Sequence, residues 1–279
     1  MKNFKKLLAV LLAGLMLLSL AACGEKKDEN VIKVGSLELE GMNDIRTDAH
    51  NAHRKEERNV ADATVFENVT YDNLSAALMD LESGKIVNLA VETSTAKYIA
   101  HRNDKVTVVE NGVRKTDFSM MMLDSNAEVY NILNDAIKAM KEDGTLESLI
   151  ENELKAYIES DPEAKDLPYF EGARTIKIGV TGDLPPMDFV AANGKAAGFN
   201  IALLTEIANR AQVNFELVQI ETGARAMALS SGKVDVVFWT KSATCTVCNS
   251  AATEKIDGTL VTESYFTDSA ATLVLKSDK

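Results

Sequence analysis

The chain has 279 residues, of which 46% are hydrophobic and 26% charged, and it contains only four prolines. This is the composition of an ordinary folded globular protein. The formal net charge of -12 at pH 7 argues against nucleic acid or anionic lipid as the ligand, because both would repel an acidic protein. The length allows one large domain or two lobes with separate cores, and we favour two lobes.

The first residues have the order of an export signal. Three lysines within the first six residues precede an apolar run that ends at Leu20, and small residues lead to Cys23. The run is shorter than the roughly 18 apolar residues of a spanning helix. The sequence Leu-Ala-Ala-Cys-Gly at 20–24 resembles the bacterial lipoprotein lipobox. The resemblance implies a signal peptide at 1–22 and a lipid on Cys23 that anchors the protein outside the cytoplasm, at the cell membrane. An ordinary signal with an incidental cysteine is the alternative.

Residues 23–30 are charged and lack apolar anchors, so we expect the lipidated cysteine to be followed by a flexible tether. From Val31 onward, β-branched runs alternate with helical patterns, which favours parallel strands joined by helices and hence an α/β fold. Strands are expected at Val31–Val34, Asn88–Val91, Val106–Val109, Phe118–Leu123, Thr175–Val180, Asn214–Ile220, Val234–Trp239 and Thr272–Leu275. Helices are expected at Leu74–Glu82, Ala127–Lys141, Leu146–Ile158 and Ile201–Ala211.

Two short sequences recur in the second half of the chain. Ile-Lys-Val-Gly at 32–35 returns as Ile-Lys-Ile-Gly at 176–179, and Leu-Glu-Ser-Gly-Lys-Ile at 81–86 returns as Leu-Ser-Ser-Gly-Lys-Val at 229–234. Helix-Gly-strand junctions recur in many α/β proteins, because glycine suits the end of a helix. The similar order and offset of both repeats nevertheless predict two similar lobes.

The second half carries an ordered set of motifs. Ile-Gly-Val-Thr-Gly-Asp-Leu-Pro-Pro-Met-Asp-Phe at 178–189 is followed by Asn-Gly-Lys-Ala-Ala-Gly-Phe-Asn-Ile at 193–201, and then by Ser-Gly-Lys-Val-Asp-Val-Val at 231–237. Together they resemble the first lobe of the bacterial extracellular solute-binding proteins of family 3. Residues 262–267, followed by 273–276, resemble the family's crossover into its second lobe.

The first half resembles the rest of that fold, taken out of order. Residues 71–85 are similar to a second-lobe helix and turn, and residues 133–146 are similar to the helices that close the chain in the family. A circular permutation with new ends at the hinge would use each piece once, and nearby surface termini can be rejoined with little change in packing. A degenerate tandem of two incomplete copies is the alternative.

The resemblance implies an α/β fold of two similar lobes, each a mainly parallel sheet flanked by helices. A hinge would join the lobes, with the ligand cleft between them. The expected parts are a second-lobe-like lobe at 31–118, a hinge return with closing helices at 119–160, a linker at 161–174, and a first-lobe-like lobe with the hinge crossover at 175–279.

The same resemblance implies a monomeric binding protein without a cofactor. It would capture a small polar, amino-acid-like metabolite and pass it to the permease of an ABC importer. Enzymes such as dehydratases and lytic enzymes exist on related bilobed folds, but Asp183, Glu92 and Lys241 form no recognisable catalytic set. We therefore expect no enzymatic activity.

The ligand-binding residues that the resemblance implies in the first-lobe-like part lie at or after the ends of two of its strands, namely Asp183, Met187, Phe189, Trp239, Thr240 and Lys241. Met187 and Phe189 are equally suited to the core, and Trp239 to the rim. The family's arginine has no clear counterpart at 253–257. Lys241 or Lys255 would supply a positive charge without the bidentate fork of a guanidinium, which leaves binding of an α-amino acid open.

In the other lobe, Glu92 and Thr93 follow the strand Asn88–Val91. The family often places an acid there against a ligand ammonium. A solvated acid at the end of a strand is the alternative.

Two other groups of residues suggest different chemistry. Cys245 and Cys248 form a C-x-x-C sequence, which outside the cytoplasm is more often a structural disulfide than a redox or metal site. An extracytoplasmic thiol/disulfide redox or sensory module is therefore the alternative function. His50 and His53 lie three residues apart, but a zinc site needs more ligands, so we expect a solvated helix and no metal.

Overall fold

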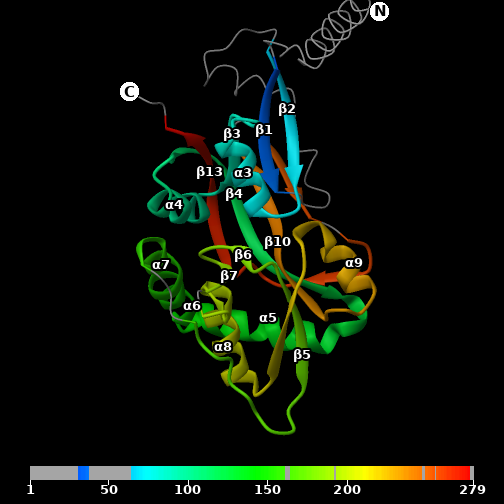
Figure 1. Cartoon of the computed structure of the whole chain (residues 1–279). Coiled ribbons are helices and arrows are strands. Elements are labelled where there is room, and N and C mark those ends of the chain that lie inside the picture. The colour runs from blue at the N-terminus through cyan, green and yellow to red at the C-terminus, as the bar shows by residue number, and fades with distance from the viewer. Residues whose placement is uncertain are drawn as a thin grey trace, which may run out of the picture.

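A computed structural model describes residues 31–37, 64–160, 164–191, 193–246, 249–254 and 256–276. Figure 1 shows an upper and a lower half, joined by long strands that pass from one into the other. The predicted α/β fold is confirmed. The signal segment, Cys23, the tether, His50 and His53 lie outside the described residues.

The upper half contains three parallel strands. β1 (Val31–Leu37) lies between β2 (Val65–Tyr71) and β3 (Asn88–Glu92), and it pairs in parallel with both. Helix α3 (Leu74–Glu82) has its predicted bounds, and its first turn is capped by Asn73, whose Oδ1 accepts a hydrogen bond from the Ala76 N–H at 2.9 Å. Helix α4 (Thr93–Arg102) starts directly after β3.

The lower half repeats this arrangement. β5 (Thr175–Val180) pairs in parallel with β9 (Asn214–Gln219) and with β10 (Val236–Cys245). Helices α8 (Phe199–Ala211) and α9 (Arg225–Ser230) connect them, with the 3-10 turn η4 (Thr222–Ala224) before α9. A small antiparallel sheet follows β5 and consists of β6 (Asp183–Leu184), β7 (Asp188–Val190) and β8 (Ala196–Ala197).

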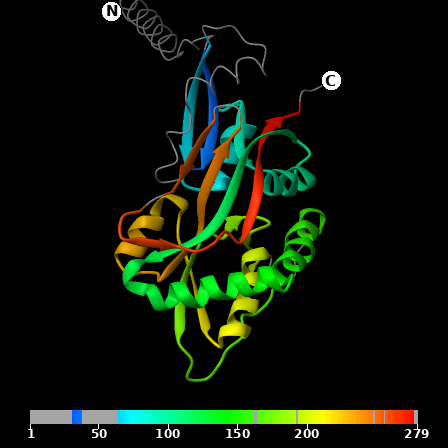
Figure 2. The same ribbon diagram turned by 180° about the vertical axis from the view of Figure 1, so that it is seen from behind.

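Helix α5 (Ala127–Glu142) lies across the lower half, as Figure 2 shows from behind. Val129, Leu133, Ile137 and Met140, spaced three or four residues apart, are fully buried, so one face of α5 packs into the core. The 3-10 turn η2 (Asp124–Asn126) precedes it, and α6 (Thr145–Leu149), the π-helical turn η3 (Ile150–Lys155) and α7 (Ala156–Glu159) follow it.

Two long antiparallel strands join the halves into a ten-stranded sheet. They are β4 (Val106–Leu123) and β13 (Phe266–Leu275), in the sheet order β2-β1-β3-β13-β4-β10-β5-β9. Strands β11 (Ser250–Thr253) and β12 (Thr259–Val261) pair with β10 and β4. The prediction of two separate strands at 106–109 and 118–123 was wrong, because the polar stretch between them also pairs with β13.

The predicted similarity of the two lobes is confirmed by strand order. In each half the first parallel strand lies between the second and the third, as β2-β1-β3 and as β9-β5-β10. The repeated glycine has a packing role in both halves. A Cβ atom at Gly35 would lie 2.4 Å from Ile86 Cδ1, and one at Gly179 would lie 2.6 Å from Ile220 Cδ1.

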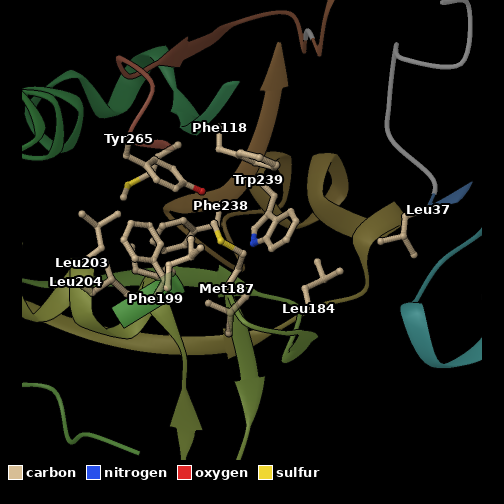
Figure 3. Packing of buried hydrophobic residues seen from close by; sticks show 14 of the residues in the cluster. Leu37, Phe118, Leu184, Met187, Phe199, Leu203, Leu204, Phe238, Trp239 and Tyr265 are labelled. Atoms are coloured by element: carbon tan, nitrogen blue, oxygen red, sulfur yellow. The ribbon is translucent and has the colours of Figure 1, made fainter. Parts of the chain in front are cut away.

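A hydrophobic core extends through both halves. Figure 3 shows Phe118, Phe238, Trp239 and Tyr265 gathered where β4, β10 and β13 meet. The rings of Phe118 and Trp239 meet edge to face at 5.2 Å, as do those of Phe238 and Tyr265 at 5.6 Å. No helix within the described part of the chain is long and apolar enough to cross a membrane.

Candidate functional site

Two residues singled out from the sequence, one in each half, form an ion pair at the junction. β3 ends at Glu92, and Lys241 lies in β10 on the far side of β13 and β4. The Lys241 Nζ atom lies 2.7 Å from Glu92 Oε1, and each residue is only 4% exposed. The alternative of a solvated acid at the end of β3 is therefore wrong for Glu92.

Aromatic rings and a second cation surround this pair. Lys241 Nζ lies 5.3 Å from the ring centroids of both Phe118 and Trp239. Burial acts to raise the pKa of Glu92, but the charges of Lys241 and Arg114 together outweigh it, so the pKa of Glu92 is lowered. Burial is also the largest influence on Lys241, and it lowers the pKa of that ammonium group.

The register of the central strands places further polar side chains on the same face of the sheet. Lys241 is paired with Phe118 across β10 and β4, and Asp268 is paired with Thr116 across β13 and β4. Paired residues share a face of the sheet, as do alternate residues of a strand. Lys241, Thr116 and Asp268 therefore project to one side of the sheet.

The first turn of α4 meets that face. The Ser94 N–H and hydroxyl both donate to Asp268 Oδ2, at 2.9 and 2.6 Å. The Thr93 hydroxyl donates to the Ser269 carbonyl at 2.9 Å. We call Glu92, Ser94, Thr116, Lys241 and Asp268 the junction cluster.

Asp183 and Phe189, two other predicted site residues, lie at contacts between the halves. Asp183 Oδ2 accepts a hydrogen bond from the Leu74 N–H at 2.9 Å, at the start of α3. Partial burial is the largest influence on Asp183 and raises the pKa of its carboxyl group. The ring of Phe189 lies 5.9 Å from the ring of Tyr98 in α4. Both residues therefore hold the hairpin β6–β7 against the upper half.

Three predicted residues are buried in the core or directly beside it. Met187 is 1% exposed, so its core alternative is confirmed. Trp239 is 2% exposed, so the rim alternative is wrong, and its Nε1–H donates to Asp188 Oδ2 at 3.0 Å. Thr240 is 2% exposed, and its hydroxyl has no hydrogen-bond partner within the described part of the protein. The roles of these residues in ligand binding stay predictions.

Sequence reasoning missed the buried carboxylate of Asp188. It accepts hydrogen bonds from the Thr181 hydroxyl at 2.8 Å, the Gly182 N–H at 2.6 Å and the Asn200 amide at 3.1 Å, in addition to Trp239. Burial is the largest influence on Asp188 and raises its pKa. Its only sequence signal is its position between Met187 and Phe189.

Sequence reasoning also missed Arg225, a guanidinium group buried beside the junction cluster. It is 3% exposed and forms an ion pair with Glu254. Its Nη1 donates to the carbonyls of Phe238 and Trp239 at 3.1 and 2.9 Å. Because these partners lie in β10 and after β11, Arg225 fixes the strand that carries Lys241.

The predicted disulfide is supported at one of its two cysteines. Cys245 is disulfide-bonded and 3% exposed, which leaves little access for thiol exchange. Its expected partner, Cys248, lies outside the described residues. Among the residues that the structure does describe, no group of three or more His, Cys, Asp or Glu is placed to hold a metal ion.

The carboxyl-terminal part of the chain is similar to a known protein family. Residues 176–277 match the model of the bacterial extracellular solute-binding proteins, family 3. The match covers less than half of the chain, so it shows a similarity of this part to that family. The matched stretch includes all of β5 except Thr175, together with β10 and β13, which carry Trp239, Lys241 and Asp268. The family match supports a solute-binding role for this protein. No curated protein matches the chain.

Several solved structures are similar to the chain at a low level. A probable amino-acid ABC transporter extracellular-binding protein from Bacillus subtilis is 13% identical over 89% of this chain and 85% of its own, with a TM-score of 0.43. A putative L-cystine ABC transporter protein from Listeria monocytogenes is 14% identical over 90% and 84%, also with a TM-score of 0.43. The arginine-bound domain 1 of TmArgBP is 33% identical over 23% of this chain and 50% of its own, with a TM-score of 0.22. Scores this low support no conclusion about this chain.

Proposed function

We propose that this protein is an extracytoplasmic solute-binding protein that binds a small polar, amino-acid-like metabolite between its two halves for an ABC importer. Cys23 would anchor it to the membrane through a lipid. The family match of residues 176–277 supports the general role. The export-signal pattern and the lipobox-like sequence at 20–24 support the location and the anchor.

The observation that carries the proposal is the ion pair between Glu92 and Lys241. Buried charges are rare in cores unless they are paired. Here they come from opposite halves and meet near two aromatic rings, on the face of the sheet that also carries Thr116, whose hydroxyl has no partner in the described structure. Charged and polar groups that converge between two lobes can orient a small zwitterion, and hinge opening would expose them.

A thermal-unfolding screen of the purified chain tests this proposal. The panel consists of amino acids, polyamines and small organic acids, and the fluorescence of Trp239 provides a second readout. A solute at a hundredfold over its dissociation constant should add about 2.7 kcal/mol to the free energy of unfolding. That gain corresponds to a rise of very roughly 5 to 10 °C in Tm.

Lys241→Met is the matched variant for this screen, because it removes one charge of the junction cluster. Lys241→Met should show no rise in Tm with any compound that binds at the junction cluster. If no compound shifts Tm, with the protein oxidised or reduced, solute capture is contradicted and a redox or partner-binding role becomes the better hypothesis.

A further inference from the structure

Trp239 adopts a backbone conformation that bulky residues rarely have. Its φ is 70°, in the left-handed region where the Cβ atom of an L-residue crowds the backbone. Trp239 also lies inside an interruption of the sheet, since the register between β10 and β4 shifts between Val237 and Thr240. A strained residue of this kind persists only where its surroundings hold it, and such residues are frequent at functional sites. The contacts that hold Trp239 are therefore candidates for a functional role.

The carboxylate of Asp188 in β7 makes the hydrogen bond that fixes the Trp239 side chain. Asp188 is 2% exposed, and its Oδ2 accepts from the indole N–H of Trp239 at 3.0 Å and from the amide of Asn200 at 3.1 Å. Its Oδ1 accepts from the hydroxyl of Thr181 at 2.8 Å and from the Gly182 N–H at 2.6 Å. These donors belong to three other segments of the lower half, namely the segment after β5, α8 and β10. An ionised carboxylate accepts about four hydrogen bonds, so these donors use the acceptor positions of Asp188.

The indole that Asp188 fixes lies beside the buried ion pair. Lys241 Nζ lies 5.3 Å from the ring centroids of both Trp239 and Phe118. These two rings meet edge to face at 5.2 Å, and Figure 3 shows them side by side. An aromatic ring attracts a cation over its face, whereas its edge is positive. A rotation of the indole would therefore weaken this attraction and leave Lys241 less well placed to meet Glu92.

We propose that Asp188 is a positioning residue of the solute site: its hydrogen bond fixes the indole of Trp239, and this ring holds Lys241 in place. Asp188 itself does not contact the solute, because its acceptor positions are used within the lower half. The ring and the ion pair of Lys241 with Glu92 are then ordered before a solute arrives, which lowers the cost of ordering side chains on binding. This inference rests on the proposed solute-binding function.

The indole N–H of Trp239 gives a direct readout, because the chain contains one tryptophan and hence one indole signal in proton–nitrogen correlation spectra. In the wild type this proton should exchange with heavy water as slowly as buried strand amides do. Asp188→Ala removes the acceptor, so the same proton should exchange at least about tenfold faster. The variant should also bind any compound found in the solute panel at least about tenfold more weakly, because the ring that holds Lys241 is no longer fixed.

Asp235→Ala is the matched control. Asp235 also lies in the lower half, where it accepts an exposed hydrogen bond from the Lys177 N–H at 2.8 Å. This variant loses the same group and should keep the indole exchange rate and the solute affinity of the wild type. If Asp188→Ala does not fold, Trp239→Phe takes its place, because it keeps an aromatic ring and removes the donor, and it should weaken binding of the same compound at least about tenfold.

Two results of the exchange measurement would overturn the inference. One is an indole N–H that already exchanges in the wild type as fast as a solvated one, which needs no variant to detect. The other is an equal exchange rate in the wild type and in Asp188→Ala.

The outcomes separate this inference from the proposed function. Faster indole exchange in Asp188→Ala without a hit in the solute panel would support the hold of Asp188 on Trp239 and contradict solute capture. A hit in the panel that binds the Asp188 and Asp235 variants equally tightly would support solute capture and overturn the positioning role of Asp188.

Discussion

At the scale of single residues, the junction of the halves contains two buried charges, and each needs the other as its partner. Glu92 and Lys241 are both buried, and each lies within reach of groups from more than one strand. A buried ion pair is weak evidence for stability, because desolvation opposes the attraction of the charges. Its position between the halves makes it a better candidate for a functional contact than for a stabilising one.

A mutant cycle on this pair tests that view. Glu92→Met alone and Lys241→Met alone should each lower the free energy of unfolding by about 3–5 kcal/mol, because each leaves one buried charge without its partner. The double variant should recover most of that loss, which urea denaturation can measure. The exposed pair of Lys33 and Glu67, at 3.6 Å, is the control, and Lys33→Met should change stability by less than about 1 kcal/mol. A double variant as unstable as the sum of the singles would contradict this interpretation.

The pH dependence of stability follows from the lowered pKa of Glu92. Between the ordinary value of 4.5 and the lowered value in the folded protein, the unfolded chain binds more protons at this carboxyl group. The contribution of Glu92 is therefore present above pH 4.5 and is lost as the pH falls through the folded pKa. Burial raises the pKa of Asp183, Asp188 and Asp268, which act in the opposite direction.

Comparing the wild type with the double Met variant at each pH separates the contribution of Glu92 from those of the other carboxyl groups. As the pH falls from about 6 to about 3.5, the unfolding free energy of the wild type should decrease relative to that of the double Met variant. Urea titrations at each pH give this difference. A difference that stays constant over this range would show that the pKa of Glu92 is not lowered by folding.

At the scale of elements, the loop from β6 to α8 holds the lower half of the junction in place. Gly198 has φ of 110°, and a Cβ atom there would lie 2.4 Å from the Met187 carbonyl oxygen and 2.7 Å from that of Pro186. These are backbone atoms, so a side chain at this position cannot be accommodated by a change of rotamer. The same backbone segment carries the contacts of Asp183 and Phe189 with the upper half.

Gly198→Ala should therefore lower the free energy of unfolding by more than about 3 kcal/mol, from backbone strain together with the clash. Gly194→Ala is the matched control, since Gly194 has φ of 81° but a Cβ atom there would meet no other atom within 4 Å. Gly194→Ala should lower the free energy of unfolding by only about 1 kcal/mol, because the left-handed backbone is the sole source of strain there. Thermal and urea unfolding measure both variants, and equal losses would show that close packing at Gly198 is unimportant.

At the scale of the whole molecule, the chain builds two similar halves and joins them through β4 and β13. Val31 and Lys276, where the described chain begins and ends, both lie in the upper half, at the start of β1 and directly after β13. The lower half is entered from α7 through residues 164–174, before β5. This arrangement is compatible with a circular permutation, which we propose for this chain.

A rearranged chain tests the permutation. It would run from Thr175 to Lys276, continue through a flexible Gly/Ser linker to Val31, and end at Ser160. If the order of the pieces matters little to packing, this chain should unfold cooperatively, with a Tm within about 10 °C of the parent. Circular dichroism and calorimetry provide the measurement. A chain that fails to fold with several linker lengths would favour the degenerate tandem.

The sequence alone determined the α/β class, the similar lobes and most elements with strong local patterns. Helices α3 and α5 follow from apolar spacing and capping residues, and β5 and β9 from β-branched runs. It missed α4, whose first turn Thr-Ser-Thr has no helical periodicity, and β2, an edge strand whose apolar residues do not alternate regularly with polar ones. Their structure depends on neighbours distant in sequence.

Only the tertiary structure decided how the junction is built. The sequence nominated Glu92, Lys241 and Asp183 one at a time, but it could not indicate that Glu92 and Lys241 would meet, 149 residues apart. It offered no reason to select Asp268 or Arg225, because their roles arise from the register of β13 and from the packing of α9 against β10. Local patterns record which face of an element is buried, whereas a site between two halves depends on long-range pairing that no local pattern contains.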